Sequence, residues 1–386
     1  MILEYIIIVS ILVTMTIITY AYLYNYFLTV SMTFDKSPVD DAKATERDNI
    51  DEKDTINILV VDGGGIRGLI PLYVIKHLEK QLGQPIDKFF DVFSGVSTGA
   101  VIVTALNVPS SHILKSHGVI NSKADLLIDL YKSESDYLFS TPWYHKLLTG
   151  CGLFSPKYLG HRLHSVMEKH FSRELNFTDL KKYVIIPSLN MHTGELHLFK
   201  NRGEDVNELP TNSLYQLVTA AVSGVTLFPP VDFMAQGKGE RSGYFVDAGI
   251  SANNPASIAL LDIIREYPDK NYYVLILGSG TPPLESSRTS YKKLKNWGKL
   301  RWASDAIKSV QRSMDSQQLN TLEIAKLVGG DVKVTYNYLN VEVSDPHIGL
   351  FEYKEINDLQ IHSDRLIKKN EDAIKQVIDH LCTAQA

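Results

Sequence analysis

A serine flanked by glycines is the first feature of the sequence whose residue types and spacing could support catalysis. It lies in a G-x-S-x-G pentapeptide formed by Gly95, Val96, Ser97, Thr98 and Gly99. A strand-like segment precedes the pentapeptide and an apolar helical segment follows it, which is the context of a nucleophile elbow. Such an elbow would expose the Ser97 hydroxyl above a sheet, at the positive end of the following helix. Small residues also fill ordinary tight turns, so the pentapeptide alone leaves both interpretations open.

A glycine-rich loop earlier in the chain could bind negative charge. Its residues are Asp62, Gly63, Gly64, Gly65, Ile66, Arg67 and Gly68. The loop follows a strand and opens a helix, so its free backbone N–H groups would form an anion-binding concavity. A dinucleotide-binding fold would need an acidic residue about 20 positions further on, at the end of a second strand, but Glu79 lies inside the predicted helix. We therefore favour an oxyanion hole, in which the amides of Gly64, Gly65 or Ile66 face an ester oxygen that becomes negative during attack.

A serine nucleophile needs a base within hydrogen-bonding distance, and an aspartate is the better candidate here. Three histidines lie among strand or loop residues without a partner signature: His192, His197 and His347. Asp247 ends an apolar strand just before Ala248 and Gly249, and functional groups gather at strand ends in α/β sheets. Asp247 is therefore the predicted base, with the alternative that it only caps the following turn.

Together these motifs resemble the patatin-like phospholipase family. That family combines D-G-G-G-x-R-G, G-x-S-x-G and D-G-[GA] in this order, often followed by A-N-N-P. The chain carries them at residues 62–68, 95–99, 247–249 and 252–255, and its L-G-S-G-T turn at residues 277–281 is similar to a glycine loop of the family. The resemblance covers residues 56–281. One departure is Ala248, which stands where glycine is commoner and favours negative φ.

The resemblance implies acyl-ester hydrolysis on a patatin-like three-layer α/β/α sandwich with a mostly parallel central sheet. Asp247 would take the proton of Ser97, and the loop from Gly63 to Gly68 would hold the oxyanion. Arg67 would hold the loop or meet a phosphate headgroup, with a structural salt bridge as the alternative. No metal or organic cofactor is implied. The expected activity is that of a phospholipase A on membrane glycerolipids; the alternatives are a transacylase, a neutral-lipid lipase, or an effector phospholipase switched on by an unknown activator.

The elements that must position these residues alternate between strand and helix. Strand-like segments are predicted at residues 58–61, 89–93, 184–189, 196–199, 243–246 and 272–277, with helices at residues 69–82 and 100–106. This alternation predicts an α/β sheet with helices on both faces. We expect a catalytic core at residues 56–281 and a mostly helical C-terminal part, residues 282–386, packed on that core.

The composition excludes several classes of protein. With 44% hydrophobic and 22% charged residues, the 386-residue chain can bury a large core, which excludes disorder as the main state. A formal net charge of -5 gives no basic field for a nucleic-acid partner. The two cysteines, Cys151 and Cys382, lie far apart, and no histidine pattern suggests zinc. The oligomeric state has no signature in the sequence.

An uncharged N-terminal stretch predicts a membrane anchor. Residues 5–34 contain no charged side chain, and about 20 helical residues suffice to cross a bilayer core. Tyrosines crowd the second half of the stretch, where amphipathic rings would lie at headgroup depth. We predict a single-pass transmembrane signal anchor at residues 1–34 that meets the bilayer through residues 5–30, followed by a polar linker at residues 35–55. A cleaved signal peptide and a buried helix are the alternatives.

Basic residues and tryptophans occur together near residue 300. The cluster consists of Lys292, Lys293, Lys295, Trp297, Lys299, Arg301 and Trp302. This combination suits an anionic membrane surface, and a solvated helix face is the alternative.

Overall fold

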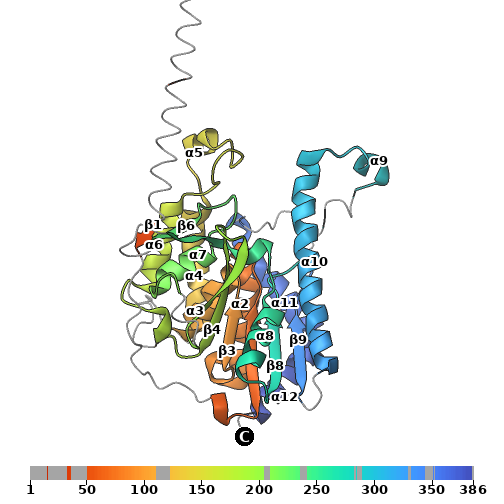
Figure 1. Ribbon diagram of the computed structural model, residues 1–386. Coiled ribbons are helices and arrows are strands. Elements are labelled where there is room, and N and C mark those ends of the chain that lie inside the picture. Colours follow the sequence, from red (N-terminus) through yellow and green to blue (C-terminus); the bar gives the residue numbers. More distant parts are fainter. Residues whose placement is uncertain are drawn as a thin grey trace, which may run out of the picture.

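The described part of the chain is built around a nine-stranded sheet (Figure 1). The computed structural model describes residues 15, 33–35, 50–109, 122–203, 209–234, 241–281, 284, 289–328, 332–343, 351 and 353–384. The strands follow the spatial order β1-β6-β7-β4-β3-β2-β8-β9, and β5 pairs with β4 outside this path. Their bounds are β1 Thr33–Asp35, β2 Thr55–Val61, β3 Val92–Gly95, β4 Tyr183–Asn190, β5 Glu195–Lys200, β6 Val231–Met234, β7 Arg241–Asp247, β8 Asn271–Leu277 and β9 Val334–Leu339.

The sheet is mostly parallel. β2 pairs in parallel with β3 and β8, β3 with β4, β8 with β9, and β1 with β6. The antiparallel pairs are β4 with β5, β4 with β7 and β6 with β7. Carboxyl ends of parallel strands meet at one edge of a sheet, where α/β proteins place their ligands. The register sets Val61 beside Gly95, so the glycine loop and the serine pentapeptide begin side by side.

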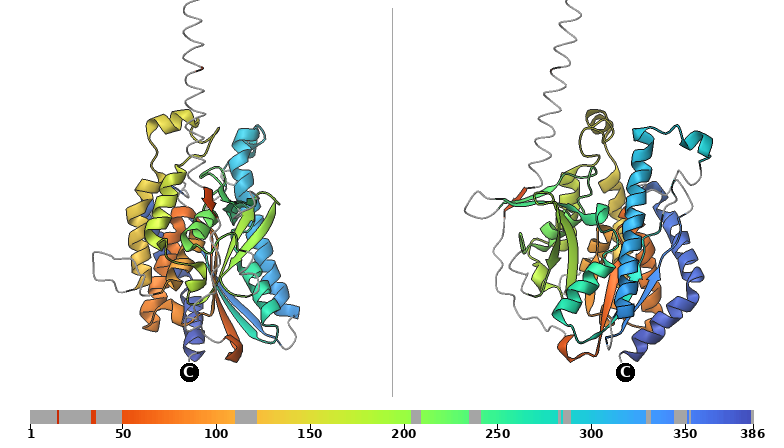
Figure 2. Two further views of the ribbon diagram at one scale, coloured as in Figure 1. Left: turned by 60° about the vertical axis from the view of Figure 1, so that its left-hand side comes forward. Right: turned by 45° about the vertical axis from the view of Figure 1, so that its right-hand side comes forward.

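Helices cover both faces of the sheet and give a three-layer arrangement (Figure 2). The larger hydrophobic core lies on the face covered by α2, α3, α4, α6, α7, α11 and α12. The second core lies on the face covered by α8 and α10. The helices are α2 Leu69–Leu82, α3 Thr98–Asn107, α4 Lys123–Phe139, α5 Trp143–Leu148, α6 Gly160–Phe171, α7 Leu214–Ala221, α8 Ala256–Glu266, α9 Tyr291–Leu294, α10 Lys299–Val328, α11 Leu359–Lys369 and α12 Glu371–Thr383.

Strand β2 shows how the sequence produces this layering. Ile56, Ile58 and Val60 belong to the core beneath α8 and α10. Leu59 and Val61 belong to the core on the opposite face. Successive side chains of a strand point to opposite faces, and a strand covered on both faces is therefore a continuous apolar run rather than an alternating one.

The predicted α/β architecture is confirmed, with two differences in its elements. Helix α2 occupies the predicted residues 69–82. The strand predicted at residues 89–93 has wrong bounds, because Phe89 caps a short 3-10 helix, Ile86–Lys88, and β3 begins only at Val92. Strands β1, β6 and β9 were not predicted, and β1 overlaps the end of the anchor predicted at residues 1–34 and the start of the linker predicted at residues 35–55. β9 escapes detection because its sequence, V-T-Y-N-Y-L, mixes polar with apolar residues and has only its end residues fully buried.

The predicted membrane anchor at residues 5–30 lies, except for Met15, outside the described residues. Among the residues that the structure describes, no helix combines the length and apolar character needed to cross a bilayer. The anchor therefore stays a prediction.

Candidate active site

The serine pentapeptide forms a strained turn between β3 and α3. Ser97 has φ 56° and ψ -124°, a region that non-glycine residues rarely occupy and that marks functional turns. A Cβ on Gly95 would lie 2.4 Å from the carbonyl carbon of Gly99, and one on Gly99 would lie 2.1 Å from the carbonyl oxygen of Val61. Glycine is therefore required at both positions. The turn holds the partly exposed Ser97 at the N-terminus of α3.

Asp247 reaches the site from β7, which lies on the opposite side of β4 from β3, the strand that leads to Ser97. It ends β7, is 8% exposed, and accepts a hydrogen bond from the amide of Gly249 at 2.8 Å; its side chain and that of Ser97 line the same pocket. Burial raises the pKa of Asp247 to about 6, while the nearby Ser97 hydroxyl and the Gly249 amide favour the charged form. Ala248 is buried in a 3-10 turn without positive φ, so the departure from glycine at this position causes no strain.

The glycine loop is fixed by contacts with two later segments. The amide of Gly63 donates to the carbonyl of Asn253 at 3.0 Å, and the carbonyl of Gly63 accepts from the Ser279 hydroxyl at 2.5 Å. A Cβ on Gly64 would lie 2.1 Å from Ser279 Oγ. Gly65 has φ 58°, which glycine adopts without strain. The A-N-N-P and L-G-S-G-T segments thus act as supports for the loop.

Three amides of this loop remain available to a ligand. Within the described residues, the N–H groups of Gly64, Gly65 and Ile66 donate to no other group. Gly65 and Ile66 line the same pocket as Ser97 and Asp247. The amides of Gly63 and Arg67 are instead occupied, the latter by the Gly64 carbonyl at 3.1 Å. The available donors are those that the sequence favoured for an oxyanion.

Arg67 and Gly68 have different surroundings. Arg67 is 5% exposed, and its Nε and Nη1 have no hydrogen-bond partner among the described residues. Burial lowers the pKa of Arg67 to about 10. No ion pair among the described residues involves this side chain, so the structural salt bridge that was the alternative role for Arg67 is not found there. Gly68 lies against Thr98, whose hydroxyl would be 2.3 Å from a Cβ at that position.

A largely apolar pocket leads away from Ser97 and Asp247. The empty space within it, which includes open solvent at its mouth, is about 650 Å³. The apolar part of its lining is Val101, Leu130, Leu138, Phe139, Leu163, Val166, Met167, Val222, Leu227, Phe228 and Phe351. No histidine is among the lining residues that the structure describes. Ser97 and Asp247 thus face a largely apolar space, although Glu134 and Ser135 of α4 also line it.

Comparison with known proteins identifies the fold family. Residues 59–260 match the family described as patatin-like phospholipase. The chain belongs to this family. It is 26% identical over 281 residues to patatin-like protein 3 of Arabidopsis thaliana, covering 65% of this chain and 64% of that protein. The predicted resemblance is thereby confirmed, although the chain spans less than two thirds of this plant relative.

Bacterial relatives in the patatin-like phospholipase family carry a name that mentions a ligand. The cGAMP-activated phospholipase of Escherichia coli (strain TW11681) is 27% identical, over 64% of this chain and 71% of that protein. The protein of the same name in Vibrio cholerae serotype O1 is 25% identical, over 76% of this chain and 85% of that protein.

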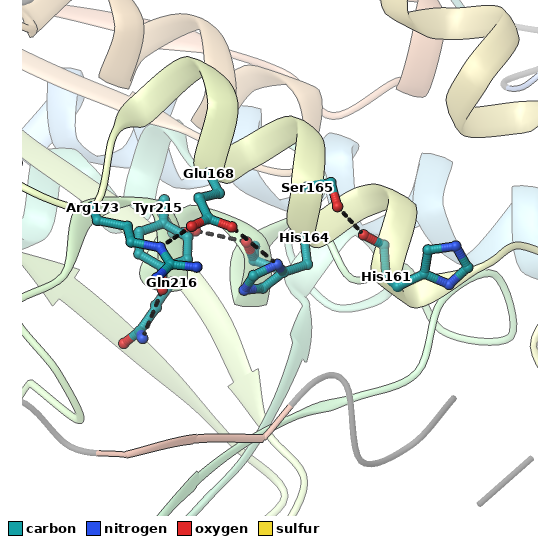
Figure 3. Close-up of polar contacts among 8 residues, drawn as sticks. His161, His164, Ser165, Glu168, Arg173, Tyr215 and Gln216 are labelled. Carbon is teal, nitrogen blue, oxygen red and sulfur yellow. Dashed lines mark hydrogen bonds and ion pairs between the residues drawn. The ribbon is translucent and has the colours of Figure 1, made fainter. Parts of the chain in front are cut away.

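The wall of the patatin-like pocket is held by polar contacts on the outer side of α6 (Figure 3). Glu168 forms ion pairs with Arg173 and, at 3.6 Å, with His164. The His164 ring packs edge-on against Tyr215 of α7, with 5.5 Å between ring centroids. The opposite side of α6 supplies Met167 and two other apolar residues to the pocket. Contacts on one side of the helix therefore fix the position of the wall on the other.

Several supporting residues could not be found from the sequence. The Tyr131 hydroxyl hydrogen bonds with Thr98, next to the serine. Behind the glycine loop, Asp62 accepts a hydrogen bond from Tyr338 at 3.0 Å. Burial and the nearby Asp315 raise the pKa of Asp62 well above its usual range. These partners come from α4, α10 and β9, and no spacing in the sequence links them to the motifs.

The histidines that the sequence did not favour as the base do not line the pocket where the structure describes them. His197 packs against the rings of Phe199 and Phe245, with centroids 5.4 and 5.6 Å away. His192 lies beside Tyr244, and His347 is outside the described residues. Among the described side chains, no group of three or more histidines, cysteines and acidic residues could hold a metal ion.

Proposed function

We propose that this protein hydrolyses carboxylic esters of glycerolipids, with Ser97 as nucleophile and Asp247 as its base. The observation that carries the proposal is that both side chains line one largely apolar pocket, together with Gly65 and Ile66 of the glycine loop. Family membership supports lipid hydrolysis. An acid with a pKa of about 6 is also matched to general base work near neutral pH.

The proposed reaction begins with proton transfer from Ser97 to the Asp247 carboxylate. The serine oxygen attacks the ester carbonyl, and the N–H groups of Gly64, Gly65 and Ile66 stabilise the resulting oxyanion. Asp247 then gives its proton to the departing alcohol, which leaves an acyl group on Ser97. Water, deprotonated by Asp247, attacks this acyl-enzyme, and its proton passes through Asp247 back to the serine oxygen. Asp247 thus acts as base and acid in turn.

The pocket supports an acyl chain as the group that is recognised. Its walls from α4, α6 and the segment after α7 are mostly apolar, with Glu134 and Ser135 of α4 as polar exceptions, and burying a methylene group gains about 0.8 kcal/mol. We therefore propose a phospholipase A acting on lipids of a membrane, to which residues 5–30 would anchor the protein. The name of the bacterial relatives favours a second candidate, in which a cyclic dinucleotide or a similar ligand activates the same hydrolase.

Fatty-acid release from mixed phospholipid vesicles tests the proposal. The wild type should release fatty acid and lysolipid, identified by mass spectrometry. Ser97→Ala and Asp247→Asn should each lose at least about a thousandfold in turnover, since both groups act in the same step. A wild type that becomes active only after addition of cyclic dinucleotides would support the ligand-activated candidate. Full turnover by Ser97→Ala would refute the assignment.

A further inference from the structure

Exposed apolar side chains gather on a loop beside the pocket. Trp143, Leu147, Leu153 and Phe154 are 75%, 74%, 70% and 80% exposed, and Tyr144 is also exposed. All five belong to α5 and the turns after it, residues 141–157, which we name the α5 loop. Soluble surfaces carry single apolar residues, but a concentration of this kind marks an interaction site.

We propose that the α5 loop, together with the basic segment at residues 289–304, docks on an anionic phospholipid bilayer and turns the pocket towards it. The inference rests on the proposed function, because it explains how a hydrolase would reach lipid in a membrane. Its occupant is the bilayer surface itself rather than a protein partner.

The α5 loop is continuous with the pocket. The loop begins shortly after Phe139, which lines the pocket, and ends just before Tyr158. The ring centroid of Tyr158 lies 5.3 Å from that of Phe139 and 5.6 Å from that of Phe228. The amide of Tyr158 donates to the carbonyl of Leu227 at 2.8 Å, and Leu227 also lines the pocket. A bilayer that receives the loop therefore lies at the pocket wall.

The loop is held in shape by its own polar contacts. His145 is fully buried, and its Nε2 lies 3.2 and 3.1 Å from the carbonyl oxygens of Pro156 and Lys157. The amide of Cys151 donates to Lys146, and that of Phe154 donates to Thr149, at 2.7 and 3.0 Å. The backbone is thus satisfied while the apolar side chains point outward. Such a rigid presentation reduces the entropy lost on binding.

Charge complementarity favours an anionic membrane. The whole chain has a net charge of -5, yet residues 141–157 and 289–304 contain no aspartate or glutamate. Their basic residues are Lys146, Lys157, Lys292, Lys293, Lys295, Lys299 and Arg301. Basic residues near an anionic lipid surface strengthen attachment, and tryptophan and tyrosine rings prefer headgroup depth.

The two segments extend from one end of the molecule. Figures 1 and 2 show α5 and α9 rising from the same end, opposite the chain's C-terminus. This is also the end where β2 and β3 finish and where the loops carrying Ser97 and the glycines begin. A bilayer that meets both segments would therefore lie over the end of the sheet from which these loops leave.

The two cysteines of the full chain provide a direct test. Cys151 lies in the α5 loop and Cys382 lies near the end of α12, and both are exposed. An environment-sensitive fluorophore is attached to Cys151 in Cys382→Ser, and to Cys382 in Cys151→Ser as the matched control. Phosphatidylglycerol vesicles containing a spin-labelled lipid should quench the Cys151 probe and leave the Cys382 probe bright. This readout is independent of any attachment through residues 5–30.

A second measurement links docking to turnover. In the variant Leu147→Asp/Phe154→Asp, the ratio of vesicle turnover to turnover of a soluble short-chain ester should fall roughly tenfold or more, because burial of two apolar side chains is lost. Leu327→Asp changes a residue that is 81% exposed at the far end of α10 and should leave the ratio unchanged.

The outcomes separate the inference from the proposed function. Equal quenching of both probes, or an unchanged turnover ratio, would overturn the docking surface. An unquenched Cys151 probe together with a smaller oligomer in the double variant would assign the surface to a second copy and likewise overturn it. A quenched Cys151 probe on a chain that cleaves neither ester would uphold docking and refute the hydrolase.

Discussion

Asp247 is a buried carboxylate that must carry charge to act as a base. Its burial opposes ionisation, and only the Ser97 hydroxyl and the Gly249 amide favour the charged form. Active sites often keep such groups at a cost to stability, because the same burial that raises the pKa strengthens the base. The result is a carboxyl group that can exchange protons near neutral pH, as the proposed base must.

The first prediction at the residue scale concerns pH dependence. Turnover of a soluble short-chain ester should rise with pH and level off above a midpoint near 6, because Asp247 must be ionised and burial raises its pKa to about 6. Asp315 is a matched control, since burial also raises its pKa to about 6 but it lies behind the glycine loop. Asp315→Asn should keep the midpoint. If the midpoint disappears in that variant, the titrating group is Asp315 rather than Asp247, which would contradict the prediction.

The second prediction concerns stability. The pKa of Asp247 is about 6 in the folded protein and about 3.9 in an unfolded chain, so the folded state binds the proton more tightly. The associated stability is present below about pH 4 and is lost as the pH rises through 6. Asp247→Asn should therefore raise the free energy of unfolding at pH 7 by up to about 3 kcal/mol. Urea denaturation should show little difference at pH 4; a less stable variant at pH 7 would contradict the burial argument.

At this scale the sequence predicted that Ser97 and Asp247 would share one site, but it did not predict their neighbours. Ser97 and Asp247 stand in motifs whose spacing is local, and the structure brings their side chains together. Tyr131 and Tyr338 contact the motifs through the tertiary fold, from positions that no pattern links to them. The amides of Gly63 and Arg67 are used within the loop, which only the folded backbone reveals.

At the scale of elements, the glycine loop depends on the turn after β8. Ser279 fixes the loop by donating to Gly63 and leaves no space for a side chain at Gly64. Strands β2 and β8 are neighbours in the sheet and pair along β2 from Thr55 to Val61. The glycine loop and the turn after β8 therefore leave the sheet at the same level. The shape of the glycine loop is thus set by two strands that lie far apart in the sequence.

The third prediction tests the contact between the glycine loop and Ser279. Gly64→Ala should lower turnover by roughly 10²–10³, the cost of losing one oxyanion donor, because the new Cβ would lie 2.1 Å from Ser279 Oγ. The double variant Gly64→Ala/Ser279→Gly removes the obstructing atoms and should recover part of the loss. A double variant no more active than the single one would show that space beside Ser279 is not the cause. Circular dichroism would establish that both variants fold.

Elements differed in how well the sequence predicted them. Helix α2 has apolar residues at helical spacing and is followed by Gly83, which adopts φ 69° as a C-cap. The sequence therefore predicted both ends of this helix. Strand β9 lies at the edge of the sheet with partly exposed tyrosines and an asparagine. Its pattern is typical of no single structure, and its pairing with β8 depends on a contact between residues about 60 positions apart.

At the scale of the whole molecule, the pocket is a product of distant segments. Phe139, Tyr158, Phe228 and Phe351 form one aromatic cluster, with Phe139 and Phe351 centroids 5.2 Å apart. These residues come from α4, the approach to α6, the segment after α7 and the chain beyond β9. Nonlocal packing of this kind cannot be inferred from one sequence, and so neither the pocket nor its selectivity was predicted.

The fourth prediction concerns acyl-chain length. Met167 lies on α6 in the pocket wall, and Met167→Trp should fill part of the space. The ratio of long-chain to short-chain ester turnover should fall at least about tenfold, since several methylene groups lose their contacts. Ile361→Trp, at a position that is 51% exposed on α11, is the size-matched control. An unaltered ratio in Met167→Trp would place the acyl chain elsewhere.

The most direct test of the central claim is covalent labelling of the nucleophile. The full chain is treated with a fluorophosphonate, and the modified peptide is identified by mass spectrometry. The wild type should carry the label on Ser97, Ser97→Ala should carry none, and Asp247→Asn should react at least about a hundredfold more slowly because its base is lost. Labelling of another serine, or equally fast labelling of Asp247→Asn, would contradict the dyad.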